Sequence, residues 1–359
     1  MAENMISIIV PTYNERDNIL PLVERLSRTL AGHNFEILLV DDSSNDGTID
    51  TAAALAGKYP VKVLVRSNER GLATAVLHGL QYAKGDIIGV MDADLQHPPE
   101  INAALLKAIE DGADMAVASR YVQGGGCPNW GLTRRIISKG ALSLAHLFLP
   151  SSRKLKDPMS GFFMFKREKI AGVVFKPIGY KILLEMLVMG QFEKVVEVPF
   201  IFNDRSSGRS KMKARQQIDY LKHIFSLMRR NGELKRFVKF CLVGLSGVVV
   251  NLGVFWIWAT YTGLPKIVCS AIAIEISIIT NFLLNDYYTF SDRRSGKSFS
   301  VFARLGKYNL ISSPGGILNL IVFPILNSVL GVYFLLAQLI GIVVSILWNY
   351  LMNNFWTWK

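Results

Sequence analysis

Charge is missing from long stretches of the last third of the 359-residue sequence. Residues 240–265 and 308–358 contain no Asp, Glu, Lys or Arg. Because a membrane-spanning helix needs roughly 20 consecutive apolar residues, these stretches exclude a protein that is soluble along its whole length. We expect four spans, at about 238–262, 265–286, 306–328 and 331–354.

Cysteine and histidine are also sparse, and this excludes several kinds of chemistry. The three cysteines, Cys127, Cys241 and Cys269, do not have metal-ligand spacing. The five histidines show no pairing of a nucleophile with a base, so we do not expect a Ser-His-Asp hydrolase. No G-x-G-x-x-G loop is present, which argues against a dinucleotide redox site.

Basic residues are in excess and give a formal net charge of +12. No nucleic-acid-binding motif accompanies them, so we expect no nucleic-acid partner and assign the excess to the anionic surface of a lipid bilayer. The basic residues cluster before the first expected span, between the second and third, and after the fourth. The positive-inside rule then predicts a multi-pass membrane protein with its N-terminal domain and both termini in the cytoplasm.

Strand-like and helix-like segments alternate over the first part of the chain. Apolar runs beginning at Ile6, Phe35, Val61, Asp86 and Asp114 are expected to be buried strands. Helices are expected over 17–30, with Asp17 as N-cap, from 46 onward, and over 71–84. This alternation predicts an α/β domain with a Rossmann-like, mostly parallel, doubly wound sheet. We divide the chain into this domain (1–203), a loop with an amphipathic helix (204–235) and an all-α membrane domain (236–359).

An acidic pair, Asp92 and Asp94, directly follows one of the apolar runs. In open α/β sheets the crevice at the carboxyl ends of the strands binds ligands. Mg²⁺ or Mn²⁺ takes oxygen ligands and often completes its shell with substrate phosphates. Asp92, Asp94 and the amide oxygen of Gln96 therefore indicate a metal–diphosphate site. A solvated Asp-rich turn is the alternative, and His97 either lies near the metal or serves as a turn residue before the next proline.

Two amphipathic stretches with basic residues, 131–149 and 216–230, flank a polar loop that carries Arg205, Arg209 and Lys211. The stretches are either core-packing helices or helices in the lipid interface, and for the second we favour the interface because membrane spans follow it. The loop is either a linker or a lid that grips phosphate, since guanidinium groups match phosphate oxygens. Further candidates for binding an acceptor phosphate are Arg120, Arg134 and Ser138.

The membrane half contains a gap-free repeat at an offset of 68 positions, in which Gly247 matches Gly315. Each copy is a two-span hairpin, so the two copies run parallel to each other. Glu275, whose counterpart is Val343, is either a functional intramembrane acid or a protonated group bonded between helices. Polar groups in lipid prefer each other, so the recurring asparagines could cap or bridge the hairpins. They are Asn251, Asn281, Asn319 and Asn349.

A set of motifs is spread over roughly the first 230 residues. They are Val10-Pro-Thr-Tyr-Asn-Glu, Val40-Asp-Asp-Ser-Ser-Asn-Asp-Gly-Thr, Asn68-Glu-Arg-Gly-Leu, Met91-Asp-Ala-Asp-Leu-Gln-His-Pro-Pro, Ser119-Arg-Tyr, Asp157-Pro-Met-Ser-Gly-Phe-Phe, Gly179-Tyr-Lys-Ile-Leu-Leu-Glu and Arg205-Ser-Ser-Gly-Arg-Ser-Lys. In combination they resemble the inverting family-2 glycosyltransferases of the GT-A fold, and the last two resemble the dolichyl-phosphate mannose synthase subgroup. The membrane half looks like the GtrA family of four-span proteins, some of which are linked to moving lipid-linked sugars.

The resemblance implies transfer of mannose from GDP-mannose to dolichyl or another polyprenyl phosphate, with inversion and with Mg²⁺ or Mn²⁺. It implies that Asp92, Asp94 and Arg205 are catalytic. The residues expected to bind the nucleotide sugar are Pro11, Tyr13, Glu15, Val40, Asp42, Asp92, Ala93, Asp94, Gln96, Arg205 and Lys211. Those expected to bind the acceptor phosphate are Arg120, Arg134, Ser138 and Arg209.

The acceptor also decides whether a base is required. A phosphate monoester with a second pKa of about 6 is largely dianionic at pH 7, so it attacks without a strong general base. Two alternatives to mannose transfer from GDP-mannose stay open. The first is the same reaction with a UDP-sugar such as UDP-glucose, and the second is a transporter that flips a lipid-linked sugar. A processive polysaccharide synthase is not expected, because the Q-x-x-R-W motif is missing.

Overall fold

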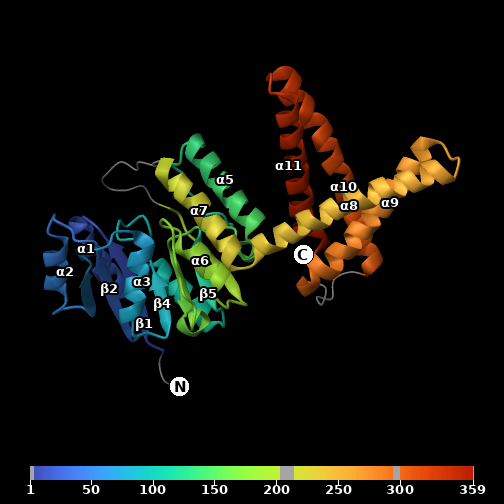
Figure 1. Cartoon of the computed structure of the whole chain (residues 1–359). Coiled ribbons are helices and arrows are strands. Elements are labelled where there is room, and N and C mark those ends of the chain that lie inside the picture. Colours follow the sequence, from blue (N-terminus) through green and yellow to red (C-terminus); the bar gives the residue numbers. More distant parts are fainter. Residues whose placement is uncertain (1–3, 203–213, 294–299, 359) are drawn as a thin grey trace. The chain divides into compact units, whose positions relative to one another are not determined.

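The structure is a computed structural model that describes residues 4–202, 214–293 and 300–358. The chain forms two compact units, Met1–Asn231 and Gly232–Lys359, and each is treated by itself. The first unit is α/β and the second is helical, as the sequence predicts (Figure 1).

The first unit is built on one seven-stranded sheet with the order β3-β2-β1-β4-β6-β5-β7. Parallel pairing joins β1 to β2 and β4, β2 to β3, and β5 to β7, whereas β6 is antiparallel to both of its neighbours. The strands are β1 (Ile6–Thr12), β2 (Phe35–Asp41), β3 (Val61–Val65), β4 (Ile87–Val90), β5 (Met115–Ser119), β6 (Phe163–Lys166) and β7 (Val195–Pro199).

Helices cover both faces of this sheet, which explains why the central strands are apolar without alternation. In β1 the side chains of Ile8 and Val10 lie in the core formed with α1, α2 and α4, and Ile9 lies in the core formed with α3 and α6. The helices are α1 (Arg16–Thr29), α2 (Thr48–Leu55), α3 (Leu72–Tyr82), α4 (Ile101–Glu110) and α6 (Ile182–Met189), with short 3₁₀ turns at Pro150–Lys154 and Arg167–Ile170.

Two features of the first unit differ from the sequence-based expectation. The first helix begins at Arg16 with Glu15 in the N-cap position, so the assignment of Asp17 as N-cap was wrong. Strands β6 and β7 were not predicted. β6 has only four residues and follows a turn-rich segment, so its apolar residues carry too little periodicity to identify a strand.

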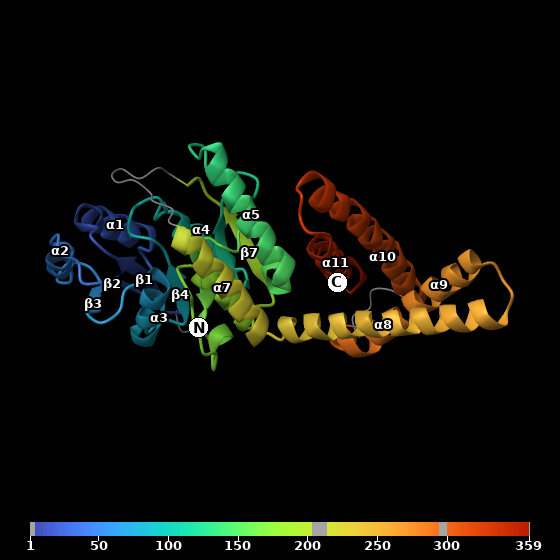
Figure 2. The same cartoon turned by 45° about the horizontal axis from the view of Figure 1, so that its top comes forward.

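Two further helices, α5 (Leu132–Phe148) and α7 (Ala214–Arg230), lie side by side (Figures 1 and 2). The Tyr220 hydroxyl of α7 donates a hydrogen bond to the Ala141 carbonyl of α5 at 2.5 Å. A buried carboxylate, Glu185 of α6, accepts a hydrogen bond from Arg230 of α7 and lies 3.3 Å from Nε2 of His223. These contacts fix α7 on the first unit.

The apolar residues of α7 separate into two stripes. Tyr220, Ile224, Leu227 and Met228 are buried, whereas an i, i+3, i+7 stripe of Ile218, Leu221 and Phe225 is more than half exposed. The sequence left open whether this helix packs on the core or faces lipid. The structure shows that one stripe packs on the core and leaves the other without protein cover among the described residues.

The second unit consists of two helical hairpins, α8 (Glu233–Tyr261) with α9 (Lys266–Leu284), and α10 (Val301–Pro324) with α11 (Phe334–Met352). Three of these helices are each extended by a π-helical turn, which is Asn285–Thr289 after α9, Ile325–Val329 after α10 and Asn353–Thr357 after α11. A 3₁₀ turn at Ser291–Arg293 comes after the extension of α9. Within the described residues, three helices are long and apolar enough to cross a membrane, namely Glu233–Tyr261, Lys266–Thr289 and Phe334–Thr357. The third predicted span, 306–328, stays a prediction on α10, whose first turns carry Arg304 and Lys307.

The helical hairpins repeat at the same offset of 68 positions as the sequence. Glu233 and Val301 begin α8 and α10, and Asn285 and Asn353 begin equivalent π-helical turns. Equivalent aromatic rings meet between the hairpins: Phe290 stacks on Trp358 at 4.3 Å. The contacts on either side of this stack also match in pairs, Phe282–Tyr308 at 5.8 Å with Tyr350–Phe240 at 5.4 Å. The two hairpins therefore associate through equivalent surfaces.

Asparagine and glycine form an equivalent contact inside each hairpin. The Asn281 amide lies against the backbone of Gly247, and the Asn349 amide lies against Gly315. For Asn281 and Asn349 the contact is therefore packing on a glycine within a hairpin, and the role of Asn251 and Asn319 stays a prediction. Glu275 of α9 accepts a hydrogen bond from the Asn309 side chain of α10 at 3.0 Å, so this acid is bonded between helices.

We expect Gly247→Ala and Gly315→Ala to destabilise the second unit by about 1–3 kcal/mol, the usual cost of overpacking. A methyl group at Gly247 would overlap Asn281, and one at Gly315 would lie 2.6 Å from Asn349 Oδ1. Gly244→Ala and Gly306→Ala are matched controls on the same helices, because nothing lies within 4 Å of their added methyl groups. Thermal unfolding of the full-length protein in detergent measures the difference, and equal stability of Gly247→Ala and Gly244→Ala contradicts the contact.

Candidate active site

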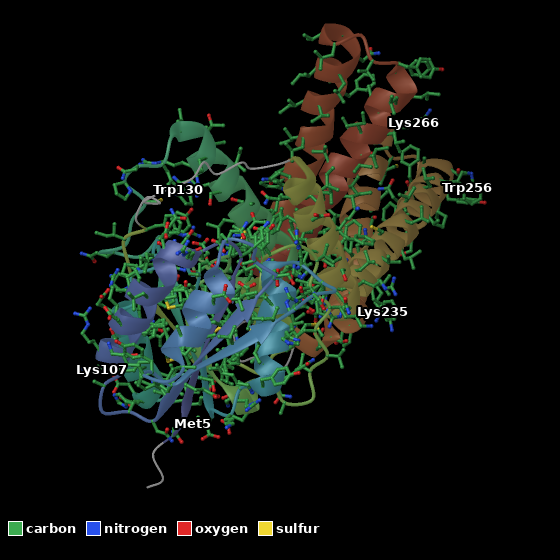
Figure 3. The ribbon with its side chains drawn as sticks, turned by 90° about the vertical axis from the view of Figure 1, so that its left-hand side faces the viewer. Met5, Lys107, Trp130, Lys235, Trp256 and Lys266 are labelled. Atoms are coloured by element: carbon green, nitrogen blue, oxygen red, sulfur yellow. The ribbon has the colours of Figure 1, made fainter. Side chains whose placement is uncertain are left out.

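A cavity of about 450 Å³ opens beside the carboxyl end of β4 in the first unit. Trp130, one of its lining residues, lies at the opposite end of this unit from Met5, which precedes β1 (Figure 3). The cavity is therefore at the edge of the sheet where an open α/β fold binds ligands. The polar and charged residues that line it include Asp92, Gln96, His97, Arg120, Arg134, Ser138, Tyr180, Lys181, Gln216, Gln217 and Tyr220.

The acidic turn after β4 is held in a fixed conformation. Leu95 has a left-handed backbone with φ of 58°, which is uncommon for a residue with a large aliphatic side chain. The Asp94 carboxylate accepts a hydrogen bond from the backbone N–H of Gln96 at 3.2 Å, and the Asp92 backbone N–H donates to Nδ1 of His97 at 3.2 Å. Gln96 is buried, whereas the Asp92 side chain is about one-third exposed at the cavity.

His97 is part of the support of this turn. Its ring is buried and stacks on Phe162 at a centroid distance of 5.1 Å. Burial lowers the pKa of His97 to about 4, although the nearby Asp94 charge opposes the shift. The imidazole is therefore neutral at pH 7, and Nδ1 accepts the Asp92 N–H. His97 supports the turn through this contact, and it also lines the cavity with Nδ1 3.6 Å from an Asp92 carboxylate oxygen, so its place near the metal stays a prediction.

The residues around the turn fit a hard divalent cation. Among the residues that the structure describes, no group of three or more His, Cys, Asp or Glu side chains could hold a metal. A magnesium site of this kind does not require one, because one or two carboxylates suffice when substrate phosphates and water complete the shell. Asp92 and Gln96 line the cavity. Asp94 lies midway between them in the sequence, but among the described residues it does not line the cavity itself.

The same cavity is also lined by arginines that lie against aromatic rings. Arg120 donates two hydrogen bonds to Asp157, at 2.7 and 2.8 Å, and the Asp157 side chain is fully buried. The Arg134 guanidinium lies 4.1 Å from the centroid of the Trp130 ring. Burial alone would lower the pKa of Arg120, but the bonds and charge of Asp157 raise it above its ordinary value. This side of the cavity is therefore permanently cationic.

Ser138 of α5 lies with the arginines. Its hydroxyl shares a hydrogen bond with the Tyr121 hydroxyl at 2.9 Å. The cavity thus brings together three predicted acceptor-phosphate residues, Arg120, Arg134 and Ser138, with two predicted metal ligands, Asp92 and Gln96. The remaining predicted acceptor residue, Arg209, lies outside the described residues, as do Arg205 and Lys211.

The residues predicted to bind the nucleotide lie at the carboxyl ends of β1 and β2. Pro11 pairs with Val40 across these strands, and the Val40 side chain is buried. Tyr13 is about half exposed. Exposed Tyr13 offers a ring to a nucleotide base, whereas Val40 can offer only its backbone. In the part of the chain that is described, none of the three lines the cavity.

Glu15 and Asp42 are already engaged in the first unit. Glu15 accepts a hydrogen bond from the Asn18 side chain at 2.6 Å. Asp42 is buried and accepts hydrogen bonds from Arg66 at 2.8 Å and from the Gly71 N–H at 2.8 Å. Asp42 therefore fixes the loop that leads into α3.

Two charged residues of the site were not assigned a role from the sequence. Asp157 is the buried partner of Arg120, and Lys181 lines the cavity at the start of α6. Burial and the Arg120 charge lower the pKa of Lys181 to about 8, against the opposing effect of Asp157 and Asp92. Both residues belong to motifs that the sequence shows, Asp157-Pro-Met-Ser-Gly and Gly179-Tyr-Lys, so the motifs could have identified them as site residues but not their contacts.

The mixed sheet, the acidic turn at a strand end and the cationic cavity, in one chain with membrane-capable helices, define a membrane-bound glycosyltransferase of the GT-A fold. Solved structures agree on the fold. Glucosyl-3-phosphoglycerate synthase of Mycobacterium tuberculosis, in complex with Mn²⁺ and UDP-glucose, matches with a TM-score of 0.51 and 21% identity, over 64% of this chain and 80% of that chain. Mannosyl-3-phosphoglycerate synthase of Rubrobacter xylanophilus matches with a TM-score of 0.52 and 20% identity, over 64% and 75%.

Family comparisons then place the chain more closely. Residues 7–173 match glycosyl transferase family 2, and residues 239–358 match the GtrA/DPMS transmembrane domain. A dolichol-phosphate mannosyltransferase of Pyrococcus furiosus is 47% identical over 98% of this chain and 99% of its own length. The dolichol-phosphate mannosyltransferase of Saccharomyces cerevisiae is 38% identical over 62% of this chain and 86% of its own length. The chain belongs to the dolichol-phosphate mannosyltransferases, a membrane-bound branch of glycosyl transferase family 2, and it transfers mannose to a polyprenyl phosphate.

Proposed function

We propose that this enzyme takes mannose from GDP-mannose and transfers it, with inversion at the anomeric carbon, to the phosphate of dolichol or a related polyprenol. The observation that carries the proposal is the cavity that Asp92 and Gln96 line together with Arg120, Arg134 and Ser138. Asp92 and Gln96 offer oxygen ligands suited to a metal-bound diphosphate, and the two arginines offer cations suited to a lipid phosphate. The sugar would lie in the same cavity.

Asp92, Asp94 and Gln96 are the residues that would hold Mg²⁺ or Mn²⁺. The bound ion would neutralise charge on the departing nucleoside diphosphate. Arg205 and Lys211 are proposed to bind the same diphosphate. Pro11, Tyr13, Glu15, Val40, Asp42 and Ala93 are proposed to form the nucleotide side of the donor site.

No strong general base is required for this step. The acceptor phosphate, with a second pKa of about 6, is largely dianionic at pH 7, so a phosphate oxygen can attack the anomeric carbon directly. His97 is neutral and is occupied by the Asp92 N–H, and Asp157 is occupied by Arg120. Arg120, Arg134, Ser138 and Arg209 are left to orient the acceptor phosphate, and orientation supplies much of the acceleration of such reactions.

The acceptor is a lipid, so its phosphate must be reached at a membrane surface. The exposed stripe of Ile218, Leu221 and Phe225 on α7 is suited to insertion into the lipid interface. Leu132 and Ile136 of α5 are also largely exposed. We propose that both helices lie at the cytoplasmic surface of the bilayer, and that the first unit and both termini are cytoplasmic, in line with the distribution of basic residues.

The donor is tested by offering the purified full-length enzyme labelled GDP-mannose, UDP-glucose or UDP-GlcNAc together with a polyprenyl phosphate. We expect a β-mannosyl phospholipid from GDP-mannose and a rate at least about 100-fold lower with either UDP-sugar. A site that hydrogen-bonds the guanine base strongly rejects a nucleotide whose base lacks the matching groups. Faster transfer from UDP-glucose would assign a different donor. Movement of label across liposomes without any glycolipid synthesis would favour the transporter alternative.

A further inference from the structure

Lys181 is a cation of the cavity that has no role in the sequence-based assignment. It is the residue that precedes α6, and its side chain lines the cavity together with Asp92 and Arg134. Its Nζ donates a hydrogen bond to the Met159 carbonyl at 3.0 Å and lies 4.5 Å from the Tyr180 ring centroid. An ammonium group has three donors, and in the described part of the chain one of them has an acceptor.

The charges around Lys181 come from both halves of the site. The groups that act on it most strongly are Arg120, Asp157, Asp92 and Arg134. Asp157 is already paired through two hydrogen bonds with Arg120. Lys181 is thus a half-buried cation that is near the metal-binding carboxylate and near the acceptor arginines, but its own hydrogen-bond partner is a neutral carbonyl. Burial of a cation is costly without an anionic partner, and the cavity is where such a partner could bind.

We propose that Lys181 binds the acceptor phosphate directly and holds its oxygens beside the reacting carbon. This inference rests on the proposed transfer to a polyprenyl phosphate. In that step a phosphate oxygen forms a bond to the anomeric carbon, the bond from that carbon to the diphosphate oxygen breaks, and the electron pair leaves with the nucleoside diphosphate. No proton is transferred, so Lys181 acts as a fixed cation. It reduces the repulsion between the two phosphate-bearing substrates, which must approach closely before reaction.

The charge of Lys181, and not merely its volume, is what the proposal requires. Lys181→Gln in the full-length enzyme is expected to raise KM for polyprenyl phosphate by about 10- to 100-fold, the range for loss of a charged hydrogen bond in a buried site. KM for the nucleotide sugar is expected to stay within about threefold. Lys181→Arg should recover much of the acceptor affinity because it restores the charge.

A matched control is Lys107→Gln, which removes one positive charge from an exposed position on α4 far from the cavity (Figure 3). It should change neither KM. Hydrolysis of the nucleotide sugar in the absence of acceptor gives a second readout, and Lys181→Gln should lower mannosyl transfer far more than it lowers this hydrolysis, because the acceptor phosphate takes no part in hydrolysis. A purely structural role for Lys181 would instead lower the unfolding temperature and reduce hydrolysis and transfer together.

The proposal is overturned if Lys181→Gln leaves KM for polyprenyl phosphate unchanged, or raises both KM values alike. It is also overturned if Lys181→Arg is as defective as Lys181→Gln. If the wild-type enzyme used none of the three nucleotide sugars, the proposed donor chemistry would fail separately. Direct binding of polyprenyl phosphate to wild-type and Lys181→Gln protein in detergent would then still decide the role of Lys181.

Discussion

Asp94→Ala is expected to lower the rate of mannosyl transfer by at least about 1,000-fold. Loss of metal-assisted charge stabilisation costs several kcal/mol, and each 1.36 kcal/mol is a factor of ten in rate. The fold should survive, because Asp94 is at a partly exposed turn and the hydrogen bond that it accepts from the Gln96 backbone N–H is worth about 1 kcal/mol. Initial rates with saturating donor and acceptor, together with thermal unfolding of the same preparation, measure both effects.

The matched control for this variant is Asp50→Ala, which removes an exposed carboxylate from the first turn of α2. It should transfer mannose at the wild-type rate. Binding of Mn²⁺ in the presence of GDP should be lost in Asp94→Ala and kept in Asp50→Ala. Turnover of Asp94→Ala near the wild-type level, or a wild-type rate unaffected by a chelator, would contradict the assignment of the acidic turn as a metal site.

The acidic turn shows how far the sequence reaches in this protein. Two carboxylates after an apolar run predict a strand end, and the structure places β4 and the cavity there. The left-handed backbone of Leu95 could not be predicted, because leucine has no preference for that region. The support from His97 was also beyond the sequence, since a histidine before a proline carries no sign of its burial against Phe162.

The arginines of the cavity were less predictable, because their geometry depends on residues far apart in the chain. Arg120 could be proposed from its motif, but its partner could not. Arg120 directly follows β5, whereas Asp157 lies in the loop before β6. β6 is a short antiparallel strand and was missed, so the sequence could not bring these residues together. The second unit was easier, because an offset of 68 positions identified both hairpins before any contact was known.

The pairing of Arg120 with Asp157 leads to the second large effect, a loss of stability. Asp157→Ala leaves the Arg120 guanidinium, whose side chain is 10% exposed, without its carboxylate. Breaking a buried ion pair by removing one partner costs about 3–5 kcal/mol, which corresponds to roughly 10 °C in unfolding temperature for a unit of this size. Faster amide hydrogen exchange in β5 would show that the first unit is the part of the protein that loses stability.

A double variant separates stability from function at the same pair. Arg120→Met combined with Asp157→Ala removes both charges, so no uncompensated charge is left and most of the stability should return. Affinity for polyprenyl phosphate should not return, because Arg120 is proposed to bind the acceptor. Recovery of both properties would mean that the pair only supports the fold. Equal stability of Asp157→Ala and the wild type would mean that Arg120 reaches water when its partner is removed, and that the cationic side of the cavity does not depend on Asp157.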